Sequence, residues 1–220
     1  MFLCFLHRSI CKTGRGDRCF CYFAKMAPTG YSLTVNVDVT EFRKQLKDAG
    51  FRFFPAYLWV ITKNLNRQTE FKIAEQDGKP GYYDTLTPLY ASFHEDDHTF
   101  SMMWTEYTDD FRKFHRRYLE NQKQYGNNHG VLCQPMTPPP ANAYTVSCLP
   151  WESFSHFAVH SYENKPYYFP SVEAGKFFEQ DGRTLMPLSL TCHHATTDGY
   201  HVHCFLRTLQ EDLDHFEQYL

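Results

Sequence analysis

A buried strand, a polar turn and an amphipathic helix follow one another near the C-terminal end of the sequence. The apolar run at residues 185–190 predicts a buried strand. Further on, apolar side chains recur at helical spacing: Val202, Phe205, Leu206, Leu209, Leu213 and Phe216. The polar residues 191–201 therefore connect a strand to a helix, and any fold of this chain must contain the three elements in that order.

The connecting turn carries a histidine and an aspartate that suit proton transfer. His194 and Asp198 are separated by three residues, and Gly199 permits backbone conformations that other residues resist. Because an imidazole has a near-neutral pKa, His194 is a candidate general base. From spacing alone, however, a structural role is the stronger interpretation, since a histidine beside a strand end is more often simply hydrogen-bonded within the fold.

A metal centre is a second interpretation of the same region, which contains His193, His194, His201 and His203. Adjacent strand residues point to opposite faces, so His193 and His194 should not converge on one ion. His201 and His203 cannot share a helical face, because that requires a spacing of three or four. The sequence therefore predicts no metal site.

Composition disfavours several classes of function and predicts a location. The chain has 22 Lys and Arg against 25 Asp and Glu, which leaves no cationic surface for nucleic acid or an anionic membrane. No run approaches the roughly 18 apolar residues of a membrane span, and the first residues lack the basic leader of a secretory signal. The eight cysteines show no paired CxxC spacing, which favours reduced thiols and a cytoplasmic protein.

Hydrophobic patterns along the rest of the chain predict one α+β domain. Alternation at residues 33–37 indicates a strand, Gly50 ends the helix that follows, and a second helix begins at Pro55. A hairpin turn is expected at residues 78–81, a charged helix at 107–125 and further strands that include 153–160. We expect a mixed, mostly antiparallel sheet with helices packed against it. Residues 1–21 show no steady period, so the single domain is assigned to residues 22–220.

Four ordered segments resemble the chloramphenicol acetyltransferase family. Residues 193–202 match its His-His-Ala-x-x-Asp-Gly-aromatic-His-Val signature, and residues 34–40 are similar to its early strand leading into a helix. The FH and TFS letters at residues 93–94 and 99–101, and VSCLPWESF at residues 146–154, stand where the family has similar motifs. Several motifs in the right order are far more specific than one.

The resemblance implies a coenzyme A-dependent acyltransferase fold and a direct acetyl transfer. His194 would deprotonate the hydroxyl of chloramphenicol, which attacks acetyl-CoA, the cosubstrate, without an acyl-enzyme. Ser147 would donate a hydrogen bond to the oxyanion, and Asp198 would shape the active-site turn by pairing with Arg15 or, in another register, Arg18. The resemblance also implies a homotrimer in which His194 faces a pocket lined by the neighbouring subunit.

The same resemblance assigns a pocket and reveals two departures. The acceptor pocket would be lined by Tyr31, Phe100, Phe157 and Val159, and Trp151 would lie on the coenzyme side of it. Glu173 stands where the family usually has a threonine that helps to order a water near the oxyanion, and Ala91 also replaces a common threonine. A carboxylate beside a developing oxyanion is unfavourable unless it is protonated, turned away or paired, for which Lys176 is a candidate.

Three classes of function remain open from the sequence. The first is an acetyl-CoA-dependent O-acetyltransferase acting on chloramphenicol. The second is an enzyme of the same fold with another hydroxyl or thiol acceptor, because dihydrolipoamide acyltransferase cores also carry a His-x-x-x-Asp-Gly motif. The third is a non-catalytic ligand-binding trimer, against which the presence of both His194 and Ser147 argues.

Overall fold

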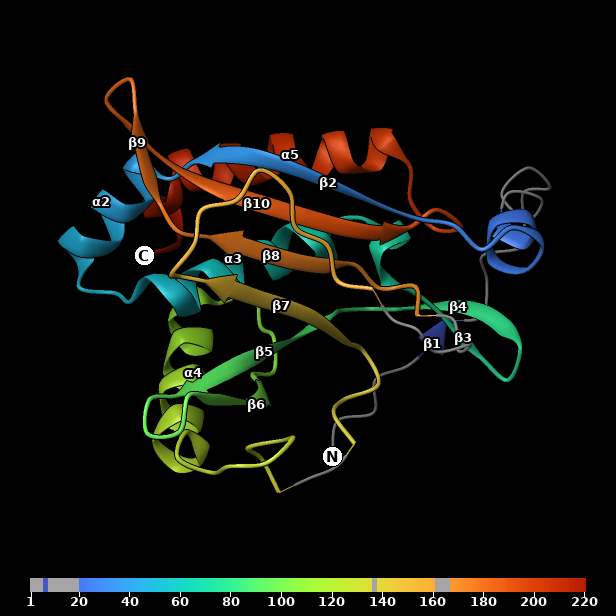
Figure 1. Ribbon diagram of the computed structural model, residues 1–220, viewed down its shortest axis with the longest axis horizontal. Coiled ribbons are helices and arrows are strands. Elements are labelled where there is room, and N and C mark those ends of the chain that lie inside the picture. The colour runs from blue at the N-terminus through green and yellow to red at the C-terminus, as the bar shows by residue number, and fades with distance from the viewer. Residues whose placement is uncertain (1–5, 8–19, 136–137, 161–166) are drawn as a thin grey trace.

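The computed structural model describes residues 6–7, 20–135, 138–160 and 167–220 (Figure 1). Within them, a seven-stranded sheet has the order β2-β10-β8-β7-β5-β6, with β9 beside β10. Its strands are β2 Gly30–Asp38, β5 Thr87–His94, β6 Thr99–Trp104, β7 Ala143–Leu149, β8 Ser171–Gly175, β9 Phe178–Gln180 and β10 Arg183–His193. A smaller sheet contains β1 Leu6–His7, β4 Lys79–Tyr83 and β3 Ile73–Gln76.

The helices of the described residues are four α-helices and three short turns of other geometry. They are α2 Thr40–Ala49, α3 Phe53–Asn66, α4 Phe111–Tyr125, α5 Gly199–Asp214, the π-helical η1 Tyr22–Met26 and the 3-10 helices η2 Thr69–Lys72 and η3 Phe216–Tyr219. None of them is long and apolar enough to cross a membrane.

The sheet is mixed and mostly antiparallel, as the sequence predicts. Strand β10 pairs antiparallel with β2, β8 and β9, and β5 pairs antiparallel with β6. Among the pairs of named strands in the described residues, only those of β7 with β5 and with β8 are parallel. Strand β10 has partners on both sides, and residues 186–190 of its apolar run are buried.

The two faces of the sheet differ sharply in chemistry. On one face, Leu188 and Leu190 of β10 lie beside Ala174 and Val172 of β8, and all four are buried in the main core. Helices α3, α4 and α5 lie on this side (Figure 1). The core includes Trp59 of α3, whose indole N–H donates to the carbonyl of Thr108 at 2.8 Å and whose ring packs on aromatic side chains of α4 and η3.

On the opposite side of the sheet, neighbouring strands carry rows of paired hydroxyl groups. Thr34 donates to Ser189 at 3.1 Å, the hydroxyls of Ser32 and Thr191 lie 2.8 Å apart, and Thr145 donates to Ser171 at 2.9 Å. The chain around residues 150–160 crosses this face (Figure 1). The amide of Lys176 holds that crossing segment by donating to the carbonyl of Glu152 at 2.8 Å, and the hydroxyl of Ser189 holds it at the carbonyl of Phe157.

Local signals in the sequence predict most element ends, with four corrections. Helix α3 begins at Phe53, two residues before the predicted start at Pro55. Gly50 ends α2 in a left-handed conformation with φ of 74°, as predicted. The hairpin turn, by contrast, consists of Asp77 and Gly78, both with positive φ, while residues 79–81 belong to β4. Helix α4 begins at Phe111 rather than 107, because Asp110 caps it by accepting from the amide of Lys113. Residues 153–160 form no strand in the described structure.

Candidate active site

The start of the turn between β10 and α5 is held by backbone hydrogen bonds. The amides of Thr196 and Thr197 donate to the carbonyl of His193 at 3.1 and 3.2 Å, which curls the chain back after the strand. The amide of His194 donates to the carbonyl of Thr29 at 2.8 Å, so the first residue of the turn is tied to the segment that precedes β2. The backbone at His194 is therefore fixed from two directions.

The imidazole of His194 is oriented for proton abstraction. Its Nδ1 lies 3.1 Å from the carbonyl oxygen of Thr197. A carbonyl oxygen can only accept, so Nδ1 carries the proton and Nε2 has a free lone pair in the neutral ring. Two aromatic rings hold this orientation: Phe23 at a centroid distance of 4.2 Å and Tyr31 at 5.4 Å. His194 therefore has the tautomer that a general base needs.

Phe23 is a site residue that the sequence analysis missed. It lies in η1, a π-helical turn far from the signature motif in the sequence, and its ring packs against that of His194. No spacing or motif points to it, because its position depends on how residues 20–29 fold against the end of β10. Tyr31, predicted to line the acceptor site, lies beside His194, and its hydroxyl donates to Thr197 at 3.3 Å.

The carboxylate of Asp198 caps helix α5 instead of contacting the ring of His194. It accepts from the amide of Tyr200 at 2.9 Å and from that of His201 at 3.3 Å, while the His201 ring accepts from the Asp198 amide. Partial burial alone would raise the pKa of Asp198, but these amides and the nearby imidazole hold that pKa below its ordinary value. The predicted partners Arg15 and Arg18 lie outside the described residues.

We expect Asp198→Ala to lower the free energy of unfolding by about 1 kcal/mol, because α5 loses its cap. Asp198→Asn keeps a capping oxygen and is expected to stay within about 0.5 kcal/mol of the parent protein while retaining most of the turnover rate. Urea unfolding and initial rates of both variants test this. A loss of turnover of about 10⁴-fold in the Asn variant would instead assign the carboxylate a charge-stabilising role in catalysis.

Ser147 lies on β7 at a level of the sheet far from His194. It pairs with Glu173 of β8, which pairs in turn with Ser189 of β10. His194 is five residues beyond Ser189, which corresponds to about 16 Å along the strand direction. Tyr31, beside His194, pairs with Cys192, so it lies on the face of the sheet opposite to that of Ser189 and Ser147. One chain therefore does not bring Ser147 and His194 together.

The other predicted pocket residues lie at the Ser147 end of the sheet or are exposed. Phe100 pairs with Phe93 across β5 and β6, and Phe93 packs on Trp151 at a centroid distance of 5.0 Å. Phe157 packs on Phe154 at 5.4 Å in the crossing segment. Phe100, Trp151 and Val159 are each more than half exposed, at 61%, 58% and 51%. The predicted site is thus divided into two half-sites, one at His194 and one at Ser147.

A surface depression of about 480 Å³ lies near the smaller sheet and belongs to neither half-site. It is lined by residues such as Ile73, Tyr83, Leu89 and Tyr167, and neither His194 nor Ser147 contributes to it. The residues with acyl-transfer chemistry therefore do not surround this depression.

Comparison with known proteins finds relatives that belong to one family. A sequence model of the chloramphenicol acetyltransferases matches residues 9–210. A chloramphenicol acetyltransferase of Clostridium perfringens is 38% identical over 191 residues, which cover 86% of each chain. One from Staphylococcus aureus is 38% identical over 184 residues, covering 83% of this chain and 84% of that one.

The chain belongs to the chloramphenicol acetyltransferase family.

This membership confirms the predicted family and, with it, the prediction of an acyltransferase. Solved structures agree at the level of the fold. A chloramphenicol acetyltransferase superposes with a TM-score of 0.81 at 22% identity, covering 95% of this chain and 100% of that one. The dihydrolipoamide acetyltransferase of Azotobacter vinelandii does so with a TM-score of 0.61 at 16% identity, covering 100% of this chain and 93% of that one.

Glu173 is the departure from the chloramphenicol acetyltransferase pattern with the clearest structural consequence. Its side chain is 1% exposed, Oε1 accepts a hydrogen bond from Ser171, and Oε2 has no partner. Burial raises the pKa of this carboxyl to about 7, although the bond from Ser171 acts in the opposite direction. Lys176 is exposed and forms no ion pair with Glu173 in the described structure. Of the three predicted alternatives, which are a protonated, a turned-away and a paired carboxyl, protonation fits the burial of Glu173 and its lack of an ion pair.

The pKa of the Glu173 carboxyl is 4.5 in the unfolded chain and about 7 in the fold. The protonated carboxyl therefore stabilises the fold fully below pH 4.5, and this contribution is lost as the pH rises through 7. We expect the free energy of unfolding of the parent protein to fall by about 3 kcal/mol more than that of Glu173→Gln over this range. Urea unfolding at pH 4.5, 6 and 8 measures the difference. Parallel pH profiles of the two proteins would mean that Glu173 is ionised in the fold.

Ala91, the second departure, lies on β5 opposite Met102 of β6. Its methyl group cannot supply the hydroxyl that is common at this position in the family. Ala91 lies two residues from Phe93, so this substitution falls in the same half-site as Ser147.

Proposed function

We propose that this protein transfers the acetyl group of acetyl-CoA to a hydroxyl of chloramphenicol. The observation that carries the proposal is the hydrogen bond from His194 Nδ1 to the Thr197 carbonyl, which leaves Nε2 unprotonated and therefore basic. Membership of the chloramphenicol acetyltransferase family supports the choice of acyl donor and acceptor.

The proposed reaction is a direct transfer with one tetrahedral intermediate. Nε2 of His194 takes the proton of the acceptor hydroxyl as its oxygen attacks the acetyl carbonyl carbon. The hydroxyl of Ser147 donates a hydrogen bond to the oxyanion that forms on the carbonyl oxygen. When the intermediate collapses, the carbon–sulfur bond breaks, and the imidazolium returns the proton to the thiolate of coenzyme A. The products are an acetyl ester, free coenzyme A and a neutral His194.

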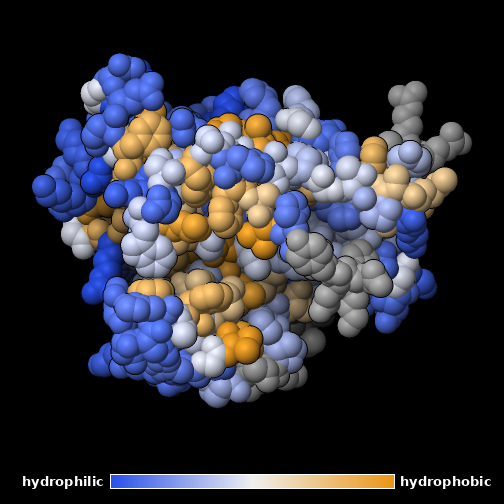
Figure 2. All heavy atoms as spheres, in the orientation of Figure 1, coloured by the Kyte–Doolittle hydropathy of each residue, from blue (hydrophilic) through white to orange (hydrophobic). Residues whose placement is uncertain are grey.

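We infer that the active site is assembled between subunits of a homotrimer, each of which is a single domain over residues 22–220. The support is the separation of His194 from Ser147 in one chain, because a direct transfer needs both groups at one carbonyl. In a cyclic assembly each interface joins one half-site to the other, so every subunit supplies both kinds. Apolar side chains gather across the middle of the face that the helices leave uncovered (Figure 2), which suits a buried contact.

The acceptor pocket would combine Tyr31 from one subunit with Phe100, Phe157 and Val159 from its neighbour. These are flat or branched apolar side chains, of the kind that bind an aromatic acceptor. Trp151 packs on Phe93 and is exposed, so it can contact the coenzyme beside Ser147.

A cytoplasmic location agrees with the state of the cysteines. Cys21, Cys133, Cys148, Cys192 and Cys204 are free thiols. Burial raises the pKa of Cys148 to about 11 and that of Cys192 to about 12, so both are unreactive neutral thiols packed as small apolar groups.

Release of free thiol from acetyl-CoA by the purified protein tests the proposed reaction. We expect release that depends on chloramphenicol, with an acetylated product identified by mass spectrometry.

A second candidate function is transfer to another hydroxyl or thiol acceptor. Buried Glu173 favours it, because this side chain changes the polarity beside Ser147. Release with other hydroxyl or thiol acceptors but not with chloramphenicol would establish that alternative, and no release with any acceptor would leave a non-catalytic binding protein.

A further inference from the structure

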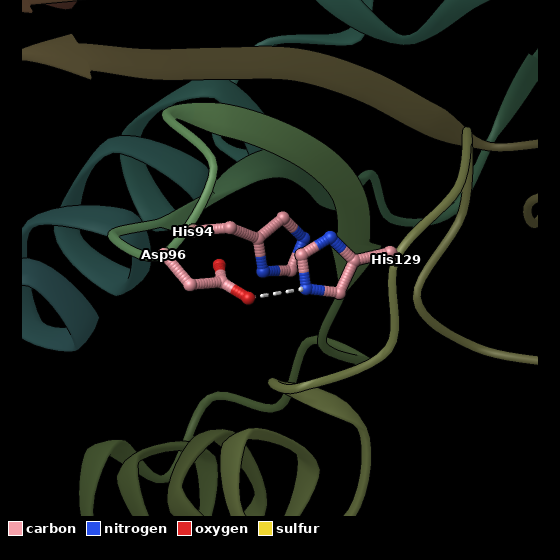
Figure 3. A group of neighbouring side chains, drawn as sticks. All are labelled: His94, Asp96 and His129. Atoms are coloured by element: carbon pink, nitrogen blue, oxygen red, sulfur yellow. Dashed lines mark ion pairs between the residues drawn. The ribbon is translucent and has the colours of Figure 1, made fainter.

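We propose that His94, Asp96 and His129 form a binding site for one zinc ion, separate from the site of acyl transfer. The three side chains come from the end of β5, from the loop between β5 and β6, and from the segment after α4. Figure 3 shows the Asp96 carboxylate lying against the nitrogen-bearing edges of both imidazole rings. One ligand atom from each residue lies within 4.8 Å of the other two, the only such group of histidine, cysteine and acidic side chains among the described residues.

The distances between the candidate ligands suit a tetrahedral ion. Zinc binds imidazole nitrogen and carboxylate oxygen at about 2.0–2.2 Å, which places neighbouring tetrahedral ligands about 3.3 Å apart. Oδ2 of Asp96 lies 3.3 Å from Nε2 of His129. The two rings are stacked at a centroid distance of 4.0 Å with an interplanar angle of 17°, so their edges face the same side. A ring nitrogen of His94 lies within 4.8 Å of the ligand atoms of both Asp96 and His129.

Each histidine is oriented through the nitrogen that the ion would not use. Nε2 of His94 forms a 2.8 Å hydrogen bond with the hydroxyl of Ser101, which leaves Nδ1 as its ligand atom. Nδ1 of His129 lies 3.0 Å from Oδ2 of Asp97, which leaves Nε2 for the ion. Metal-binding histidines typically have such a hydroxyl, carbonyl or carboxylate partner on the second nitrogen, since it fixes the ring and strengthens the ligand.

The supporting groups are themselves held in place. Asp97 accepts from the amide of Thr99 at 3.0 Å and from its hydroxyl at 2.7 Å. Ser101 is 1% exposed and His94 is 5% exposed, so one ligand is anchored in the protein interior. Asp96 is exposed, which leaves a path for the ion and room for water as the fourth ligand.

The ion would join two segments that run beside the Ser147 half-site. The chain that carries His129 continues along β6, where the amide of Met102 donates to the carbonyl of Val131 and that of Cys133 donates to Met102, both at 2.9 Å. Phe100 lies in the same strand. Zinc would therefore stabilise the β5–β6 loop and the edge strand that carries Phe100.

Calorimetric titration of the full-length, EDTA-treated protein with zinc chloride tests the site. We expect one tight zinc ion per chain, and an affinity at least about 10-fold lower in His129→Ala and in Asp96→Asn. His203→Ala removes an exposed histidine of α5 and should leave the affinity unchanged. Cobalt(II) gives a second readout, because a tetrahedral nitrogen and oxygen site produces visible absorption bands that both loop variants should lose.

The competing explanation is a protonated His129 that bridges Asp96 and Asp97 without any metal. In that case zinc would bind no more tightly to the parent protein than to His129→Ala, and cobalt would give the same spectrum with both. Equal zinc affinities or equal cobalt spectra of the parent protein and the loop variants would overturn the proposal. These measurements do not depend on acetyl transfer, so they are independent of the proposed function.

Discussion

Replacing His194 with alanine is expected to lower the rate of acetyl transfer by about 10⁴-fold, the upper end of the range for a general base. The size of the effect follows from the tautomer: Nε2 of His194 is the base that the proposal assigns to the acceptor hydroxyl, and Nδ1 is already committed to the Thr197 carbonyl. The affinity for chloramphenicol is expected to change little, because the proton is transferred only in the transition state.

The initial rate of thiol release at saturating acetyl-CoA measures this loss, and the melting temperature shows whether the variant is folded. His203→Ala is the matched control, since it removes an exposed imidazole from the neighbouring helix. A His194→Ala protein that turns over within about 10-fold of the parent protein would remove His194 from the mechanism.

Replacing Ser147 with alanine is expected to lower the turnover rate by about 10²–10³-fold, the effect of losing one donor to an oxyanion. Ser147 is half-buried on the side of the sheet with the paired hydroxyl groups, and its carbonyl accepts from Tyr57 at 3.3 Å, so its backbone is held independently of the hydroxyl. Truncating the side chain should therefore leave the fold and the KM values nearly unchanged.

Rates and melting temperatures of Ser147→Ala and Ser189→Ala, compared with those of the parent protein, separate catalysis from packing. Ser189 is the buried serine two strands away in the same row, and its hydroxyl bonds to the crossing segment. Its loss should lower stability more than turnover. Equal losses of turnover in both variants would mean that Ser147 acts through the structure of the sheet.

The sequence predicts those parts of the fold that depend on local pattern. The apolar run of β10, the stripe of α5 and the left-handed Gly50 are read directly from neighbouring residues, and the structure contains all three. Residues 153–160 include the strand-favouring Phe154, Phe157 and Val159, but they cross the sheet face instead of pairing with it. Pairing depends on which edge is free, and that is decided by the whole sheet.

The candidate site likewise contains some residues that the sequence predicts and others that it does not. His194, Ser147 and Asp198 belong to motifs, so the sequence alone can single them out. Phe23 belongs to none, and its contact with His194 arises from the fold of a π-helical turn against the end of β10. The separation of the two half-sites is likewise invisible in the sequence, because it depends on the register between β7, β8 and β10.

Mixed assembly of two inactive proteins tests the central claim, that the active site combines His194 of one subunit with Ser147 of another. Unfolded His194→Ala and Ser147→Ala chains are mixed in equal amounts, refolded together and assayed for thiol release. In a cyclic trimer one interface of every mixed assembly joins an intact His194 to an intact Ser147, so random mixing should restore about one quarter of the parent activity. Activity no higher than the sum of the two separately refolded variants would contradict a site shared between subunits.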